Sequence, residues 1–208
     1  MIDELYKDQM DRFWDRFGKV VAKLGLTPNM VTVAGIVLCA ANAAAFPWHR
    51  NFVAFGLLVA AIELLDNVDG AVARVTGTST LYGSYLDAVT DRYKDFFILF
   101  SIAFVTGYWV PCVLAIAGSM ITSYNAARAA QLGATDDGGK GGLPDLFERL
   151  ERIATICVGV VFTGFFAPDL VFGHDLLWGV LWLVAILTHL TAIQRFVRRG
   201  QVLKGFDA

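Results

Sequence analysis

Charged residues are scarce in this sequence. Asp, Glu, Lys and Arg make up 17% of its 208 residues, whereas hydrophobic residues make up 56%. Water-soluble domains carry about 25% charged residues, so this composition excludes an ordinary soluble or disordered protein. It predicts an all-α integral membrane protein, and the length suits one compact helical domain.

Cysteine and histidine are also few. Three of each occur, with no C-x-x-C spacing and no ligand spacing among the histidines, and all three cysteines fall inside apolar runs. This pattern excludes a disulfide framework and a cysteine–histidine metal site. We expect the cysteines to be small buried hydrophobic residues and His189 to be a packed polar side chain. Neither an internal repeat nor a cleavable signal peptide is expected, the latter because residues 1–24 are charged throughout.

Four aspartates lie at the ends of two segments that are hydrophobic enough to enter a bilayer. Two of them follow one apolar run and two precede the next: Asp66, Asp69, Asp87 and Asp91. Spacings of three and four residues put each pair on one face of a helix. The eight residues between the segments include Gly77 and suit a chain reversal. Antiparallel helices would therefore bring four carboxylates together, and ionisable groups in a membrane segment usually mark a functional site.

Four clustered carboxylates need compensating positive charge. Two divalent cations, Mg²⁺ or Mn²⁺, would supply it and would divide the aspartates between them. The nearby basic residues are Arg74, Arg92 and Lys94. Structural ion pairs of the aspartates with Arg74 and Arg92 are the alternative. Gly and Ala on the same helical faces favour the metal site, because they leave space that a structural ion pair does not need.

Residues 66–91 form the pattern D-x-x-D-G-x-x-A-R, a gap of eight residues, and G-x-x-x-D-x-x-x-D. Every fixed position is present, so the chain resembles the CDP-alcohol phosphotransferase family (class I). Over most of its length the resemblance is closest to the phosphatidylinositol phosphate and archaetidylinositol phosphate synthases. It implies transfer of a phosphatidyl-type group, with a diacylglycerol or an archaeal diether, from a CDP-lipid to an alcohol, releasing CMP in phospholipid biosynthesis.

The resemblance also implies roles for individual residues. The four aspartates would hold the two metal ions, and Asp91 would also accept the proton of the attacking hydroxyl. Arg74, at a helix end, would contact a phosphate of the nucleotide, and Gly70 and Gly83 would permit close approach of ligand to backbone. The remaining CDP-lipid contacts would come from the family's entry motif and one hydroxyl-bearing position: Asn29, Met30, Val31, Thr32 and Thr80.

Apolar residues recur at helical spacing through residues 1–24, with charged residues between them. This pattern predicts an amphipathic juxtamembrane helix in the membrane interface, followed by a membrane domain over residues 25–208. Thr27 and Pro28 suit the start of its first helix, where Asn29 and Thr32 taken alone would be capping residues. Six transmembrane helices are expected, at residues 28–46, 51–74, 80–107, 110–132, 147–166 and 171–197.

The basic residues predict the orientation. Of the 17 Lys and Arg residues, Arg50 alone falls beside a loop on the side opposite the N-terminus. By the positive-inside rule, this multi-pass protein of the cytoplasmic membrane has both termini and the aspartates on the cytosolic side. The expected partners are the CDP-lipid, a soluble alcohol, membrane lipids and, as the resemblance implies, a second copy in a homodimer. No nucleic-acid partner is expected.

Three more stretches, at residues 123–129, 148–152 and 191–195, resemble the subfamily whose acceptor alcohol carries a phosphate, such as inositol phosphate. They would place three arginines around one cytosolic pocket for that phosphate: Arg128, Arg152 and Arg195. Arginine at a cytosolic helix end is also ordinary, so each has a structural reading. The subfamily's Lys and Glu beside the first arginine are replaced by Ala126 and Ala130. A different phosphate is therefore an alternative, unless Lys140 substitutes.

Other functions stay open at this point. Glycerol 3-phosphate is the alternative phosphorylated acceptor, followed by unphosphorylated inositol or serine. A cation transporter or channel would also explain aspartates in apolar segments, but it would not explain Arg74, the Gly and Ala positions or the cytosolic arginines. Proline-broken helices and a repeat between the two halves, which would support a transporter, are not evident.

Overall fold

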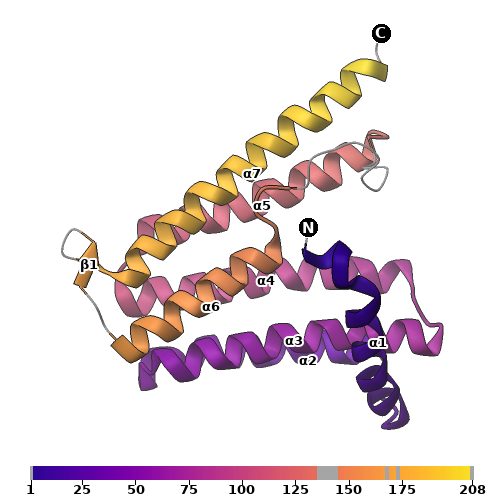
Figure 1. Cartoon of the computed structure of the whole chain (residues 1–208), viewed down its shortest axis with the longest axis horizontal. Helices are drawn as coiled ribbons and strands as arrows, with labels where there is room; N and C mark the ends of the chain where they lie inside the picture. Colours follow the sequence, from indigo (N-terminus) through magenta and orange to yellow (C-terminus); the bar gives the residue numbers. More distant parts are fainter. Residues whose placement is uncertain (1, 135–144, 167–168, 172–173, 207–208) are drawn as a thin grey trace. The chain divides into compact units, whose positions relative to one another are not determined.

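The computed structural model describes residues 2–134, 145–166, 169–171 and 174–206. These residues form helices α1 to α7 and one short pair of strands, β1 and β2 (Figure 1). The chain divides into two compact units, Met1–Ile98 and Leu99–Ala208. The division falls inside helix α4, so each unit contains part of that helix.

The first unit contains four helical elements: α1 (Ile2–Lys23), α2 (Pro28–His49), α3 (Phe52–Thr76) and the first part of α4 (Leu81–Thr106). Local signals explain where they begin and end. The Thr27 side chain accepts a hydrogen bond from the Met30 amide, and Pro28 is the first residue of α2, as predicted. Helix α3 ends at Gly77, whose φ of 65° favours glycine.

Within the first unit, α2 and α3 run side by side and α1 crosses α3 (Figure 1). The buried rings of Phe46 on α2 and Phe55 on α3 stack with their centroids 4.1 Å apart. Near the C-terminal end of α3, a Cβ atom added at Gly18 of α1 would lie 2.8 Å from the carbonyl carbon of Ala71. Because only a glycine fits there, α1 lies directly against the part of α3 that carries the aspartates.

The second unit contains the rest of α4 and five further elements: α5 (Trp109–Gln131), α6 (Arg149–Phe166), β1 (Asp169–Val171), β2 (His174–Asp175) and α7 (Leu176–Phe206). Helices α5 and α6 both pack against α7, with Gly118 against Thr188 and Gly159 against Val180. The imidazole Nε2 of His189 lies 3.1 Å from a backbone carbonyl oxygen of α5, as expected of a packed polar side chain.

The antiparallel strands β1 and β2 are the only β-structure in the described residues, and they were not predicted. They occupy positions where the last transmembrane helix was expected to begin, at residue 171, so that helix instead begins at Leu176. Strands of three and two residues are too short to show an alternating apolar pattern. The three cysteines are buried and reduced, as expected.

Three helices in the described part of the chain are long and apolar enough to cross a membrane, as expected of a membrane protein. They are α2, α5 and the Leu176–Gly205 part of α7. In α3, α4 and α6, charged residues interrupt or border the apolar stretch, among them the aspartates on α3 and α4. Length and composition therefore identify three of the six predicted spans.

Candidate active site

The two aspartate segments lie at adjoining ends of consecutive helices in the first unit. Asp66 and Asp69 are near the C-terminal end of α3, and Asp87 and Asp91 are near the start of α4. In the connection, the Thr78 amide donates to the last turn of α3 over 3.0 Å. The chain therefore reverses where the sequence predicted it.

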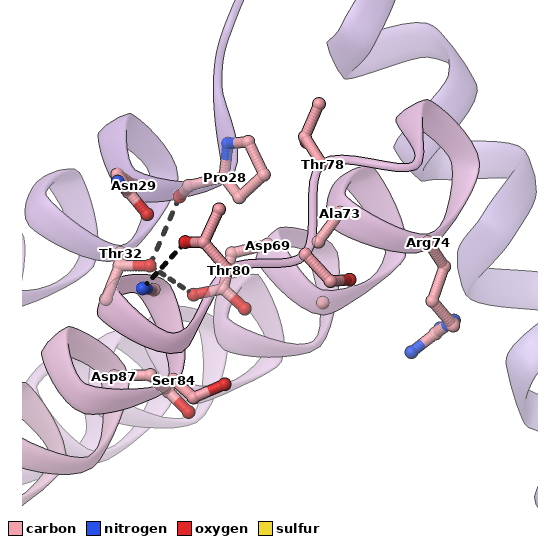
Figure 2. A pocket seen from close by; sticks show the side chains of 13 residues that line it. Pro28, Asn29, Thr32, Asp69, Ala73, Arg74, Thr78, Thr80, Ser84 and Asp87 are labelled. Carbon is pink, nitrogen blue, oxygen red and sulfur yellow. Dashed lines mark hydrogen bonds between the residues drawn. The ribbon is translucent and has the colours of Figure 1, made fainter.

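A cavity of about 250 Å³ lies at these helix ends (Figure 2). Asp69 and Asp87 line it, together with six of the eight residues that were expected to bind the CDP-lipid: Asn29, Thr32, Gly70, Arg74, Thr80 and Gly83. The other two, Met30 and Val31, lie beside the cavity on α2, and the Met30 side chain is exposed. The structure thus brings the N-terminal end of α2 together with both aspartate segments.

Thr32 connects α2 to one of the aspartates. Its hydroxyl Oγ1 lies 2.5 Å from Oδ2 of Asp69 and 3.1 Å from the carbonyl oxygen of Pro28 (Figure 2). Both Thr32 and Asp69 are buried, so this charge-assisted hydrogen bond holds the carboxylate in one orientation. The helix cap is provided by Thr27 rather than by Thr32.

Gly83 lies where α2, the connection and α4 meet. Its backbone amide donates to the Thr80 hydroxyl over 3.0 Å. A Cβ atom at this position would lie 3.2 Å from Thr80 Oγ1 and 3.3 Å from Asn29 Oδ1, both polar atoms of the cavity wall. A larger residue would therefore displace groups that face the cavity.

The other two aspartates contact a lysine. The Lys94 ammonium forms ion pairs with Asp66 and with Asp91 Oδ1, the latter over 3.1 Å, and Arg92 lies 3.7 Å from Asp91 Oδ2. Asp66 also lies close to α2, because a Cβ atom at Gly35 would be 3.2 Å from its Oδ1. Sequence reasoning included Lys94 among the nearby cations but assigned it no partner.

Arg74 forms an ion pair with a carboxylate of α1. Its Nε and Nη2 atoms each lie 3.2 Å from Oδ1 of Asp15 on α1. Its side chain lies apart from Thr32, Asp69 and Thr80 (Figure 2). Asp15 is thus a partner of Arg74 that the sequence did not indicate.

The donor set suits Mg²⁺ or Mn²⁺. Asp69 lies in the electrostatic field of Asp66 and Asp87, so carboxylates from both helices act on one another. The four carboxylates outnumber the two cations beside them, Lys94 and Arg92, and oxygen-bound divalent cations offset such an excess. Across the described residues, no three acidic, histidine or cysteine side chains yet converge on one metal position. The residues therefore fit a divalent cation by donor type and charge.

The three arginines expected to bind the acceptor lie in the second unit. Arg128 is exposed and donates to Gln131 on its own helix over 2.6 Å. Arg152 on α6 is almost fully buried. Arg195 on α7 contacts α5, where its Nη1 donates to the Thr122 carbonyl over 3.3 Å. Lys140, the suggested substitute, lies outside the described residues.

Arg195 has a carboxylate partner that sequence reasoning missed. Its Nε donates to Asp145 Oδ2 over 2.7 Å, and its Nη2 pairs with the same oxygen. Arg198, one turn further along α7, pairs with Asp145 Oδ1 over 3.1 Å. The Asp145 side chain is 8% exposed, so one nearly buried carboxylate holds two arginines at this helix end.

Comparisons with known proteins agree with these observations. The family model described as CDP-alcohol phosphatidyltransferase matches residues 25–191. The archaetidylinositol phosphate synthase of Pyrococcus horikoshii is 35% identical over 184 residues, which cover 87% of each chain. Two crystal structures of the phosphatidylinositol phosphate synthase of Mycobacterium tuberculosis are also similar.

The structure with CDP-DAG bound has a TM-score of 0.73 at 29% identity, and the match covers 90% of this chain and 94% of that one. The complex with manganese and citrate has a TM-score of 0.72 at 28% identity, covering 89% and 88%. The matched region includes the complete aspartate pattern and the residues that line the cavity. The chain therefore belongs to the CDP-alcohol phosphatidyltransferase family.

Proposed function

We propose that this transferase moves the phosphatidyl-type group of a CDP-linked lipid to inositol phosphate and releases CMP, as a step of phospholipid biosynthesis. The observation that carries the proposal is the cavity in which Asp69 and Asp87 meet the residues expected to bind the donor. Similarity to synthases that make phosphatidylinositol phosphate and archaetidylinositol phosphate supports the acceptor. The lipid is a diacylglycerol or an archaeal diether, since both kinds of synthase are relatives.

The reaction is a substitution at the phosphorus attached to the lipid. The acceptor hydroxyl forms a new P–O bond, the bridging P–O bond of the pyrophosphate breaks, and CMP leaves with the bonding electrons. Asp91 accepts the proton of the attacking hydroxyl. A carboxylate that also binds metal is a weak base, so correct positioning of the hydroxyl supplies part of the rate enhancement.

Asp66, Asp69, Asp87 and Asp91 would hold two divalent cations, Mg²⁺ or Mn²⁺. When bound, they neutralise charge on the pyrophosphate and on the leaving group. Thr32 keeps the Asp69 carboxylate oriented through their 2.5 Å hydrogen bond. The manganese complex of a relative supports a divalent ion in this family.

The cavity wall binds the donor. Asn29, Thr80 and Gly83 form a narrow polar surface for the CDP group, with Met30 and Val31 at its edge and Gly70 open to the ligand. Arg74 contacts a donor phosphate, for which its planar guanidinium is well suited. Arg128, Arg152 and Arg195 bind the phosphate of the acceptor.

In the membrane, residues 1–24 form an interfacial helix and residues 25–208 form a domain of six transmembrane helices. Both termini and the active site face the cytosol, because the expected spans put 16 of the 17 basic residues on the side of the N-terminus. A soluble acceptor and metal ions then reach the site from the cytosol of a cell membrane. The active form is a homodimer.

The experiment is a substrate panel. Purified protein receives CDP-diacylglycerol or its archaeal diether counterpart together with inositol phosphate, glycerol 3-phosphate, inositol or serine, and CMP release is measured. Inositol phosphate should give the highest kcat/KM. Glycerol 3-phosphate is the second candidate, because Ala126 and Ala130 stand where the subfamily has Lys and Glu. Preference for an unphosphorylated alcohol would overturn the phosphate pocket, and no CMP release with any acceptor would overturn the transferase.

A further inference from the structure

Lys94 is a lysine with no solvent-exposed side-chain surface. It lies on α4 three residues after Asp91, and its side chain is 0% exposed. Burying an ammonium group is costly unless it is paired with opposite charge. Its position therefore depends on the acidic residues around it.

The partners of Lys94 come from two helices. Its Nζ lies 3.1 Å from Oδ1 of Asp91 on α4 and pairs with Oδ2 of Asp66 on α3. Glu63, one turn before Asp66, also acts electrostatically on the ammonium. One buried cation thus connects the two helices that carry the aspartates.

We propose that Lys94 is a positioning residue of the metal site, an internal counter-ion that holds Asp66 and Asp91 in place and limits how tightly the site binds divalent metal. This inference rests on the proposed role of the two aspartates as metal ligands. The ammonium uses carboxylate oxygens that a metal would share, and its positive charge repels a divalent cation. At the same time it keeps the helices together when little metal is present.

A purely structural lysine predicts a different outcome. If Lys94 only joined α3 to α4, its removal would destabilise the protein equally with and without metal, and metal affinity would stay the same or fall. If Lys94 is a counter-ion, its removal leaves buried carboxylates without their cation. A divalent ion then binds them more tightly and replaces the missing charge.

The test measures metal binding and melting temperature in Lys94→Met and Lys94→Gln, both purified with Mn²⁺ and then stripped of metal. Mn²⁺ affinity, followed by the electron paramagnetic resonance signal of the free ion, should rise at least tenfold. Without metal, both variants should melt at least about 6 °C below the wild type. Saturating Mn²⁺ should raise their melting temperature more than that of the wild type, because tighter binding stabilises the folded state more.

Lys204→Met on α7, whose lysine is exposed, is the control for loss of a positive charge and should change neither quantity. Unchanged or weaker Mn²⁺ binding in the two Lys94 variants would overturn the proposal. So would variants that stay unfolded at saturating Mn²⁺, because a metal would then be unable to replace the lysine. Absence of Mn²⁺ binding by the wild type would overturn the proposed metal site as well, whereas tight wild-type binding without a gain in the variants would overturn the role of Lys94 alone.

Discussion

Replacing Arg195 by alanine separates acceptor binding from donor binding. Two hydrogen-bond acceptors hold the Arg195 guanidinium in place. Its Nε donates to Asp145 Oδ2 over 2.7 Å and its Nη2 pairs with the same oxygen, while its Nη1 donates to the Thr122 carbonyl oxygen over 3.3 Å. A guanidinium fixed in this way is ready to bind a phosphate with little further ordering. We expect Arg195→Ala to raise KM for inositol phosphate at least tenfold and to leave KM for the CDP-lipid nearly unchanged.

The magnitude follows from the chemistry and the exposure of the side chain. Hydrogen bonds to charged groups contribute about 1.5–3 kcal/mol. The Arg195 side chain is 19% exposed, so solvent screening places its contribution near the lower end of that range. A tenfold change in KM corresponds to about 1.4 kcal/mol. The variant should also be less stable, because Asp145 would keep Arg198 as a partner but lose Arg195.

The assay measures initial rates of CMP release while one substrate is varied and the other is saturating. Arg199→Ala is the matched control, because this arginine lies one turn further along α7 and donates to the Asn125 carbonyl over 3.3 Å. It should affect stability without changing acceptor KM. The double variant Arg195→Ala/Asp145→Asn removes the carboxylate charge as well, so it should recover melting temperature while acceptor KM stays high.

Three results would refute this reasoning. Acceptor KM could stay unchanged in Arg195→Ala, it could rise equally in Arg199→Ala, or it could return to the wild-type value in the double variant. In the last case the effect of Arg195 would be structural rather than a direct contact with phosphate. The protein would then remain a CDP-alcohol phosphatidyltransferase that recognises its acceptor elsewhere.

Replacing any one of the four aspartates by alanine should abolish CMP release, while the protein still inserts and purifies. The four variants are Asp66→Ala, Asp69→Ala, Asp87→Ala and Asp91→Ala. Full activity in any of them would contradict the two-metal site. Asp91→Asn should retain more Mn²⁺ binding than Asp87→Asn, because its proton-accepting role is separable from metal binding. Exhaustive chelation should stop CMP release and added Mg²⁺ or Mn²⁺ should restore it, whereas activity of metal-stripped enzyme would favour ion pairs as the role of the aspartates. Asp15→Asn should raise KM for the CDP-lipid up to about fivefold, since an exposed ion pair contributes up to about 1 kcal/mol; Lys19→Gln on the same helix is the control, and an equal KM in both would refute the role of Asp15.

Helix positions were predictable because their signals are local. The Thr27–Pro28 pair marked the start of α2, and Gly77 marked the end of α3, since each acts on the backbone within a turn. The last helix was placed five residues too early because strands β1 and β2 are too short to produce a pattern of their own. Length and composition identify three spans, fewer than the six expected from the sequence. Charged residues on α3 and α4 explain why these two helices are not among the three.

The aspartates were predictable for a similar reason: residues three or four apart share a helical face. Their partners were not. Lys94 is 28 residues from Asp66, Arg195 is 50 residues from Asp145, and Arg74 is 59 residues from Asp15. No periodicity relates residues at such separations, so these pairs exist only through tertiary packing.

The contact between α1 and Arg74 illustrates what such packing adds. The amphipathic pattern of residues 1–24 predicted a helix in the membrane interface, and that pattern is compatible with a helix that only anchors the chain. Gly18 allows α1 to reach the backbone of α3 at Ala71, and one turn earlier Asp15 pairs with Arg74. Because Arg74 also lines the cavity, the carboxylate of α1 and a donor phosphate would share one guanidinium. If Arg74 binds a donor phosphate as proposed, α1 would help to orient the donor indirectly, through the contact of Asp15 with that arginine.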